Sequence, residues 1–285
     1  MYPVIFRIGS FPITSFGVMM FLSFIVGAWV LARQLERYGL EGKLAWDLLA
    51  GMAIGGIVGA RLYYVGLHFD DFLANPVAEL FARGGLVWYG GFMGGVFGYW
   101  IQVHNRDLPM AVMFDATAPA LAIAYAVGRL GCFLVGDDYG IPTDSWIGIA
   151  FPEGSPPTTA GYLRSVGADV PPSVPDTEIL RVHPTQLYEI AAGLTMFAFL
   201  RRFASRPHRT GQPFALFLIL YGIERFAVEF VRAKGDRVIA GLSTSQIASI
   251  ALLGLGAFLY FRSTGRSLQP DSAATARQAV RSASS

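Results

Sequence analysis

Seven mostly apolar stretches run along this chain of 285 residues, and they restrict its fold more than any other feature. A helix needs about 20 such residues to cross the hydrocarbon core of a bilayer. The pattern therefore predicts an all-α integral membrane protein, a bundle of about seven transmembrane helices. We expect these helices at 13–32, 46–67, 86–103, 110–135, 185–203, 213–231 and 243–261.

The amino-acid composition is typical of a protein in lipid and argues against binding of nucleic acid. Hydrophobic residues make up 53% of the chain and charged residues 15%, which is outside the balance of a soluble domain. The formal charge is +2, and no run of five like charges occurs, so no nucleic-acid partner is expected. Glycines such as Gly55, Gly59, Gly90 and Gly94 predict close helix packing, because small residues let helix backbones approach in lipid.

The domain organisation follows from the spacing of the stretches. We expect one transmembrane domain over 1–261, with an outer head formed by the loop 136–182, which holds seven of the 16 prolines. The tail 262–285 lacks hydrophobic periodicity and is expected to be disordered and cytoplasmic. The start of the chain lacks the basic residues of a secretory signal, so the first stretch is expected to be retained as a helix.

Positive charges predict the orientation of the bundle. Segments after the odd-numbered stretches hold twelve Lys and Arg residues, against seven on the other side. Because Lys and Arg concentrate on the cytoplasmic side, the N-terminus and the head are predicted to be periplasmic and the C-terminus cytoplasmic.

Three arginines fall inside predicted helices, namely Arg61, Arg129 and Arg225. A charged residue within a membrane is costly and normally faces a partner or a wet cavity, so each arginine marks a candidate site. All three lie in the later halves of helices that run outward, which places them in the outer leaflet.

The sixth stretch carries further polar residues at helical spacing. Tyr221, Arg225, Glu229 and Arg232 follow at intervals of four and three and share one face of a helix. One interpretation is a ladder in which Glu229 neutralises Arg225 and Arg232. The other is a binding face, since a paired arginine can still donate hydrogen bonds to a phosphate. Guanidinium groups suit phosphate, and phospholipid headgroups supply phosphate at this depth.

Two other segments are polar at the predicted outer surface. His183, Gln186 and Glu189 follow at intervals of three around the start of the fifth stretch. His183 could be an interfacial anchor or a functional residue. Tyr89 is followed by two glycines, which would let a ligand approach, although aromatic residues are common at this interface in any case.

Three motifs together resemble a known family. They are Gly128-Arg129-Leu130-Gly131, the run from His183 to Glu189, and Tyr221-Gly222 followed by Arg225, Glu229 and Arg232. In order and spacing the chain resembles, from about Val4 to Phe261, the prolipoprotein diacylglyceryl transferases of bacterial inner membranes. The resemblance implies transfer of the diacylglyceryl group of phosphatidylglycerol to the lipobox cysteine of preprolipoproteins, with release of glycerol 1-phosphate.

The resemblance also implies roles for individual residues, with Arg129 holding the phosphate and Arg225 essential. The expected catalytic residues are Arg129, Arg225, His183, Glu189 and Tyr89. The expected substrate-binding residues are Arg129, Arg61, Tyr221, Glu229, Arg232, Gln186, Asp137 and Gly140. Neither a cofactor nor a metal ion is expected. The single cysteine, Cys132, excludes a thiolate cluster and is interpreted as a packed small residue rather than a reactive thiol.

The chain departs from the family pattern at polar positions. Tyr89 stands where the family usually has a histidine, Phe16 where it has a tyrosine, and Asp137 where it has a glutamate, although Gly140 is kept. Cys132 and Val135 replace two asparagines. Tyrosine is a poor base near neutral pH, so removal of the thiol proton would fall to His183 or Glu189. Two alternatives follow, a divergent enzyme with another acceptor and a non-catalytic lipid-binding subunit.

Overall fold

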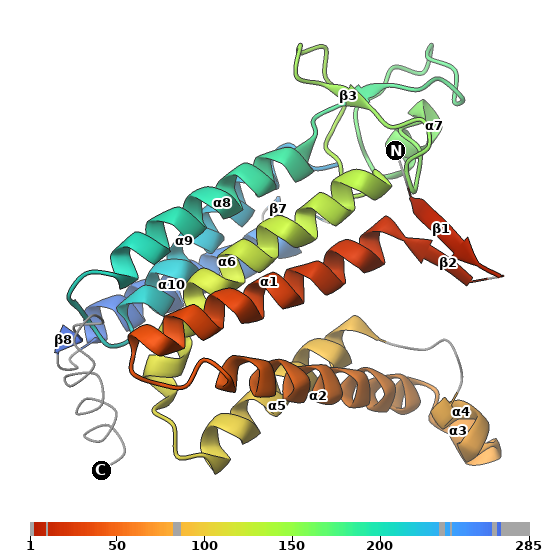
Figure 1. Ribbon diagram of the computed structural model, residues 1–285. Helices are drawn as coiled ribbons and strands as arrows, with labels where there is room; N and C mark the ends of the chain where they lie inside the picture. The colour runs from red at the N-terminus through yellow and green to blue at the C-terminus, as the bar shows by residue number, and fades with distance from the viewer. Residues whose placement is uncertain are drawn as a thin grey trace. The chain divides into compact units, whose positions relative to one another are not determined.

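A computed structural model describes residues 3–9, 11–81, 87–233, 237–239, 241–263 and 267–268 of the chain (Figure 1). Their contacts divide them into two compact units. The first unit takes its residues from 1–30 and 114–269, and the second covers 31–113.

Each predicted stretch overlaps one long helix, with ends that differ by up to five residues. These helices are α1 (Ser15–Arg37), α2 (Leu44–Leu67), α5 (Trp88–Asn105), α6 (Met110–Val135), α8 (Thr185–Ala204), α9 (Gln212–Val228) and α10 (Thr244–Arg262). Within the described residues, α1, α2, α6 and α10 are long and apolar enough to cross a membrane. Of the other long helices, α8 contains Glu189, Arg201 and Arg202, α9 has only 17 residues, and α5 ends on the polar residues His104 and Asn105.

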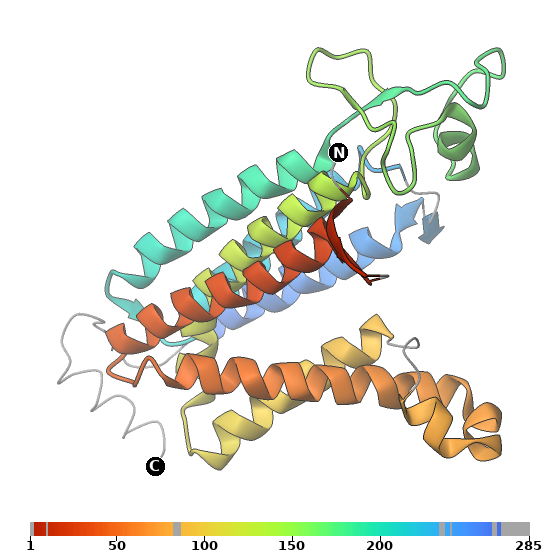
Figure 2. The same ribbon diagram turned by 45° about the vertical axis from the view of Figure 1, so that its right-hand side comes forward.

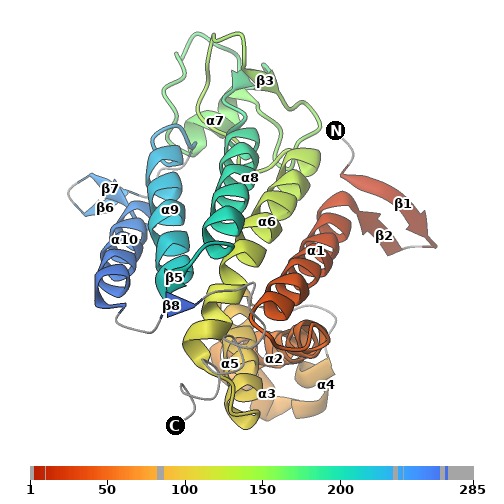
Figure 3. The same cartoon turned by 60° about the vertical axis from the view of Figure 1, so that its left-hand side comes forward.

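In the first unit, α6, α8, α9 and α10 lie side by side around an apolar core (Figure 3). Ala122 of α6, Leu200 of α8 and Leu218 of α9 are buried in this core. Buried Asp115 fixes the start of α9, because its carboxylate accepts hydrogen bonds from the backbone N–H groups of Gly211 at 2.7 Å and Phe214 at 3.2 Å.

The connection between α6 and α8 forms an ordered head with a small apolar core. It contains strands β3 (Ile149–Ala150) and β4 (Arg181–Val182), which pair antiparallel, and the short helix α7 (Ala160–Ser165). Tyr139, Phe151 and Leu163 are buried in this core. The head therefore has packing of its own, and it stands at the end of the helices where the predicted polar residues gather.

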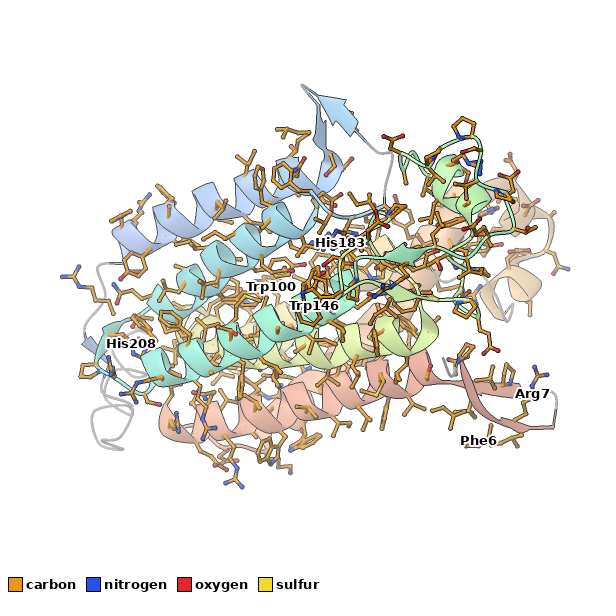
Figure 4. The ribbon with its side chains drawn as sticks, turned by 90° about the horizontal axis from the view of Figure 1, so that it is seen from above. Phe6, Arg7, Trp100, Trp146, His183 and His208 are labelled. Carbon is orange, nitrogen blue, oxygen red and sulfur yellow. The ribbon has the colours of Figure 1, made fainter. Side chains whose placement is uncertain are left out.

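Further short strands lie before α1, on either side of α9 and after α10. An antiparallel hairpin of β1 (Val4–Ile8) and β2 (Phe11–Thr14) precedes α1 and carries Phe6 and Arg7 (Figure 4). Strand β6 (Arg237–Ile239) pairs with β7 (Leu242–Ser243), and β5 (His208–Arg209) pairs with β8 (Ser267–Leu268). Most of the predicted disordered tail, from 269 onward, lies outside the described residues.

The second unit is built on close packing of α2 against α5 (Figure 2). A Cβ added to Gly94 would lie 2.1 Å from the carbonyl oxygen of Gly55, and one added to Gly59 would lie 2.3 Å from that of Gly90. The predicted role of these glycines in helix packing is confirmed. Two short helices, α3 (Phe69–Ala74) and α4 (Pro76–Phe81), follow α2.

Replacing Gly94 with alanine is expected to lower the thermal unfolding midpoint of the purified protein by several degrees. The added methyl group would push α5 away from α2, and overpacking of this kind costs about 1–3 kcal/mol. Gly66 of α2 is the matched control, because a Cβ there meets no atom within 4 Å and alanine is the better helix former. Equal midpoints for Gly94→Ala and Gly66→Ala would contradict the packing argument.

Candidate functional site

Two arginines from different helices meet at one buried carboxylate. The Nε atom of Arg129 lies 3.1 Å from Oε2 of Glu189, and Nη1 of Arg225 lies 2.6 Å from Oε1 of the same residue. Glu189 is 0% exposed, and Arg225 also contacts Glu229 at 3.4 Å. The end of α6, the start of α8 and the end of α9 thus bring their charged residues together, as the sequence predicts.

Asp138, directly after α6, adds a second bridge between arginines. Its Oδ2 atom accepts a hydrogen bond from Nη1 of Arg129 at 2.9 Å, and its Oδ1 atom accepts one from Nη2 of Arg232. Arg232 also lies 4.0 Å from Glu189. The predicted ladder is therefore wrong at Arg232, because α9 ends at Val228 and Arg232 pairs with Asp138 instead of Glu229. Helical spacing does not apply beyond the end of the helix.

Hydrogen bonds from the start of α8 hold the loop that carries Asp138. Gln186 donates from Nε2 to the carbonyl of Asp137 at 2.5 Å, and Thr185 donates from its hydroxyl to the carbonyl of Asp138 at 2.6 Å. A Cβ on Gly140 would lie 2.2 Å from the carbonyl oxygen of Val231, so only glycine allows this approach of the loop to the chain beyond α9.

A tyrosine and a glutamate lie beside the arginines, and the sequence did not identify them as site residues. The hydroxyl of Tyr125 donates to Glu224, at 3.1 Å from each carboxylate oxygen. The guanidinium carbon of Arg129 lies 5.4 Å from the centre of the Tyr125 ring, within cation–π range. Tyr221 contacts the same ring edge to face at 5.4 Å. The spacing of Tyr125 and Arg129, one helical turn apart, was the available signal.

Several buried polar atoms at this site have no hydrogen-bond partner within the described part of the chain. They include Oε1 of Gln186, Oε1 of Glu229, Oδ1 of Asp137 and Nε of Arg232. Buried polar atoms are normally paired, so these atoms are available to a polar ligand. Burial, and next the neighbouring charge of Asp138, raises the pKa of the Asp137 carboxyl.

A pocket of about 600 Å³ adjoins the Asp138–Arg232 pair. Both residues line it, together with Tyr139, Tyr162 and Arg164 of the head. Arg164 is held by Asp176 at 3.1 Å and by the carbonyl of Val174. The pocket therefore offers two guanidinium groups and two phenols next to the cluster of arginines and carboxylates.

Comparison with known proteins assigns this arrangement to a family. The family model described as prolipoprotein diacylglyceryl transferase matches residues 3–262. The chain belongs to this family. Together with the four apolar helices, membership of the prolipoprotein diacylglyceryl transferases makes it a multi-pass bacterial membrane protein.

Individual family members match over nearly their whole length. The phosphatidylglycerol–prolipoprotein diacylglyceryl transferase of Clostridium tetani is 28% identical over 260 residues, which cover 91% of this chain and 97% of that protein. The proteins of the same name from Neisseria gonorrhoeae and Bordetella bronchiseptica are 30% and 32% identical. The alignments cover 89% and 90% of this chain, and 93% and 94% of those proteins.

Three further residues predicted from the family pattern, His183, Arg61 and Tyr89, lie outside the ion-pair bridges described above. His183 comes before α8 rather than on it, and its Nδ1 atom lies 3.1 Å from the hydroxyl of Tyr188. Figure 4 shows His183 at the head end of the helices and His208 at the opposite end. Arg61 and Tyr89 belong to the second unit, where Arg61 donates to the carbonyl of Glu79 at 3.1 Å and Tyr89 is 65% exposed.

Cys132 and Phe16, which replace other residues of the family pattern, border the site. The buried Cys132 thiol lies 3.7 Å from Nη1 of Arg129, and Phe16 packs near Gly131. Ligand atoms of Cys132, Asp137 and Asp138 lie within 4.8 Å of one another. Because Arg129 already donates to the cysteine and to Asp138, its positive charge disfavours a metal cation there.

Proposed function

We propose that the protein transfers the diacylglyceryl group of phosphatidylglycerol to the lipobox cysteine of preprolipoproteins and releases glycerol 1-phosphate. The observation that carries this proposal is the meeting of Arg129 and Arg225 at Glu189. The family match supports it, and the relatives bear that activity in their names. These matches do not favour another acceptor or a non-catalytic subunit.

In the proposed mechanism, Arg129 and Arg225 bind the phosphate of the lipid. As the carbon–oxygen bond to glycerol phosphate breaks, the phosphate gains charge, and fixed cations stabilise that charge more in the transition state than in the bound lipid. Each carboxylate oxygen of Glu189 lies at ion-pair distance from one guanidinium group, Oε1 at 2.6 Å from Arg225 and Oε2 at 3.1 Å from Arg129. We therefore assign it an orienting role, instead of the role of base that the sequence left open.

The remaining substrate contacts are assigned by position around the arginines. Arg232 and Asp137 are assigned to the glycerol headgroup, and Gln186 and Gly140 hold the loop that carries Asp137. Glu229 pairs with Arg225 and Tyr221 packs on Tyr125, so both are assigned to the phosphate end of the site. His183 is proposed to meet the acceptor peptide where the head joins α8. Arg61 stays a predicted substrate-binding residue, and Tyr89 a predicted catalytic residue.

The proposal includes a topology. We infer that all seven long helices cross the inner membrane as one transmembrane domain, with the N-terminus and the head in the periplasm and the C-terminal tail in the cytoplasm. The distribution of Lys and Arg supports this orientation. It puts the head on the side where exported preprolipoproteins would arrive.

The test is an assay with purified protein, phosphatidylglycerol and a peptide that contains a lipobox cysteine. Release of glycerol phosphate together with a thioether-linked diacylglyceryl peptide is expected. A peptide with serine in place of the cysteine is the control and should release none. Absence of release from the folded protein with the cysteine peptide would refute the proposed function.

Replacing Arg164 with alanine is expected to raise the KM for phosphatidylglycerol several-fold and to leave kcat nearly unchanged. Arg164 lines the pocket beside Arg232 and would add a weak, ground-state contact to the glycerol headgroup. Arg181→Ala is the matched control, because Arg181 binds the carbonyls of Trp146 and Gly148 in the head away from that pocket. A similar KM for phosphatidylglycerol in both variants would show that the pocket is not part of the substrate-binding site.

A further inference from the structure

The pair formed by Tyr125 and Glu224 is a polar group at the site that the proposed function does not use. Tyr125 projects from α6 one turn before Arg129, and Glu224 directly precedes Arg225 in α9. Glu224 is 8% exposed, and its two oxygens share the Tyr125 hydroxyl at 3.1 Å. A buried carboxylate normally has a reason to be retained, because its burial is costly.

The other carboxylates of the site are committed to arginines. Glu189, Glu229 and Asp138 each lie within 4.0 Å of a guanidinium nitrogen. Among the carboxylates described at this site, only Glu224 and Asp137 have no arginine at ion-pair distance. A carboxylate paired with arginine holds its charge too firmly to take up a proton, so these two are the candidates for a base.

Position separates the two candidates. The Tyr125 ring lies under the Arg129 guanidinium, so the phenol borders the place where the phosphate, and hence the reacting carbon attached to it, would bind. Asp137 faces Cys132 in the loop after α6. The Tyr125 oxygen can accept a hydrogen bond from a thiol while its own O–H points to Glu224.

We propose that Tyr125 and Glu224 form a relay that removes the proton from the acceptor thiol. This inference rests on the proposed function. The thiol proton passes to the Tyr125 oxygen as the Tyr125 proton passes to Glu224. The thiolate sulfur attacks the glycerol carbon, a carbon–sulfur bond forms, the carbon–oxygen bond breaks, and its electron pair leaves on glycerol phosphate. The proton returns through Tyr125 to the released phosphate, which restores both residues.

Charged groups around the relay come from three helices. Glu224 is faced by Tyr125 and Arg129 of α6, by Glu189 of α8 and by Arg225 of its own helix. Helix α10, which packs against α9, carries no Asp, Glu, Lys or His between Thr244 and Arg262. Arginines stay charged at any working pH, so changes in a pH profile would report on the carboxylates and on the thiol.

The first experiment measures glycerol phosphate release against pH for Glu224→Gln and Tyr125→Phe. Each variant is expected to lower kcat about a hundredfold, as loss of a general base does, and to leave the KM for phosphatidylglycerol within a factor of two. The increase in rate with pH that accompanies deprotonation of Glu224 in the wild-type protein should be absent from both variants. Glu224→Asp should recover part of the rate. Tyr125→Phe keeps the ring that packs on Arg129, and its thermal unfolding midpoint, measured beside the rate, separates a folding defect from loss of the relay.

The second experiment supplies a nucleophile that needs no base. A lipobox peptide with selenocysteine in place of cysteine carries a selenol that is already ionised near neutral pH. Both variants should react with it at close to the wild-type rate, a result that a purely structural role would not give. Asp137→Asn tests the other candidate base. Its rate is expected still to increase with pH as in the wild-type protein.

The outcomes are separable from those of the proposed function. Active wild-type protein with unchanged profiles in Glu224→Gln and Tyr125→Phe overturns the relay and leaves the transferase activity in place. If the increase in rate with pH is lost in Asp137→Asn and kept in the other two variants, the relay is also overturned and Asp137 is the base. Wild-type protein that releases no glycerol phosphate refutes the proposed function itself.

Discussion

Replacing Arg129 with lysine is expected to lower the rate of glycerol phosphate release at least about a hundredfold, the usual cost of losing one preorganised donor to a developing charge. The Arg129 guanidinium contacts Glu189 through Nε at 3.1 Å and Asp138 through Nη1 at 2.9 Å at the same time. A lysine ammonium is a single point of charge and cannot bridge both carboxylates while it also binds a phosphate. The measurement is steady-state release from phosphatidylglycerol with the cysteine peptide.

The Arg129 prediction has a direct control in the same protein. Arg106 is half-exposed in the second unit and pairs with Asp47 at 3.4 Å. An exposed ion pair of this kind contributes little, so Arg106→Lys should keep the wild-type rate. If Arg129→Lys also kept the wild-type rate, a positive charge alone would suffice at position 129. The argument that a guanidinium group must bridge two carboxylates there would then be wrong.

Replacing Glu189 with glutamine should cost both activity and stability. Glu189 is 0% exposed and neutralises Arg129 and Arg225, so the neutral amide leaves two buried guanidinium groups repelling each other. Breaking a buried ion pair in this way typically costs about 3–5 kcal/mol. We expect a clear fall in the thermal unfolding midpoint and loss of glycerol phosphate release beyond about a hundredfold.

Glu153→Gln provides the comparison for Glu189→Gln, since Glu153 is exposed in the head and the substitution is chemically identical. It should leave both the midpoint and the rate near wild type. A stable Glu189→Gln protein that retains activity would show that the two arginines do not depend on this carboxylate for their arrangement.

Hydrophobic length was sufficient to predict where the long helices lie. Each of the seven stretches overlaps a long helix, because about twenty apolar residues in lipid must satisfy their backbone hydrogen bonds internally. The meeting of Arg129 and Arg225 near the start of α8 was also within reach, since alternating directions bring the end of α6, the start of α8 and the end of α9 together. That all seven helices cross the membrane stays a prediction.

The rest of the site depends on contacts that no local pattern encodes. Asp138 joins Arg129 to Arg232 only because the chain turns sharply after α6, where Asp138 takes a φ of +57°. Tyr125 and Glu224 are 99 residues apart, and nothing in their neighbourhood in the sequence indicates the pairing. Arg232 followed helical spacing in the sequence, but the helix ends at Val228.

The loop that carries Asp138 is joined to the end of α9 by backbone pairing, with Gly140 opposite Arg232 and the N–H of Ile141 donating to the carbonyl of Val231 at 2.8 Å. These hydrogen bonds join the start of the head to the segment that carries Arg232. We therefore expect a polypeptide that displaced the head on binding to displace Arg232 as well.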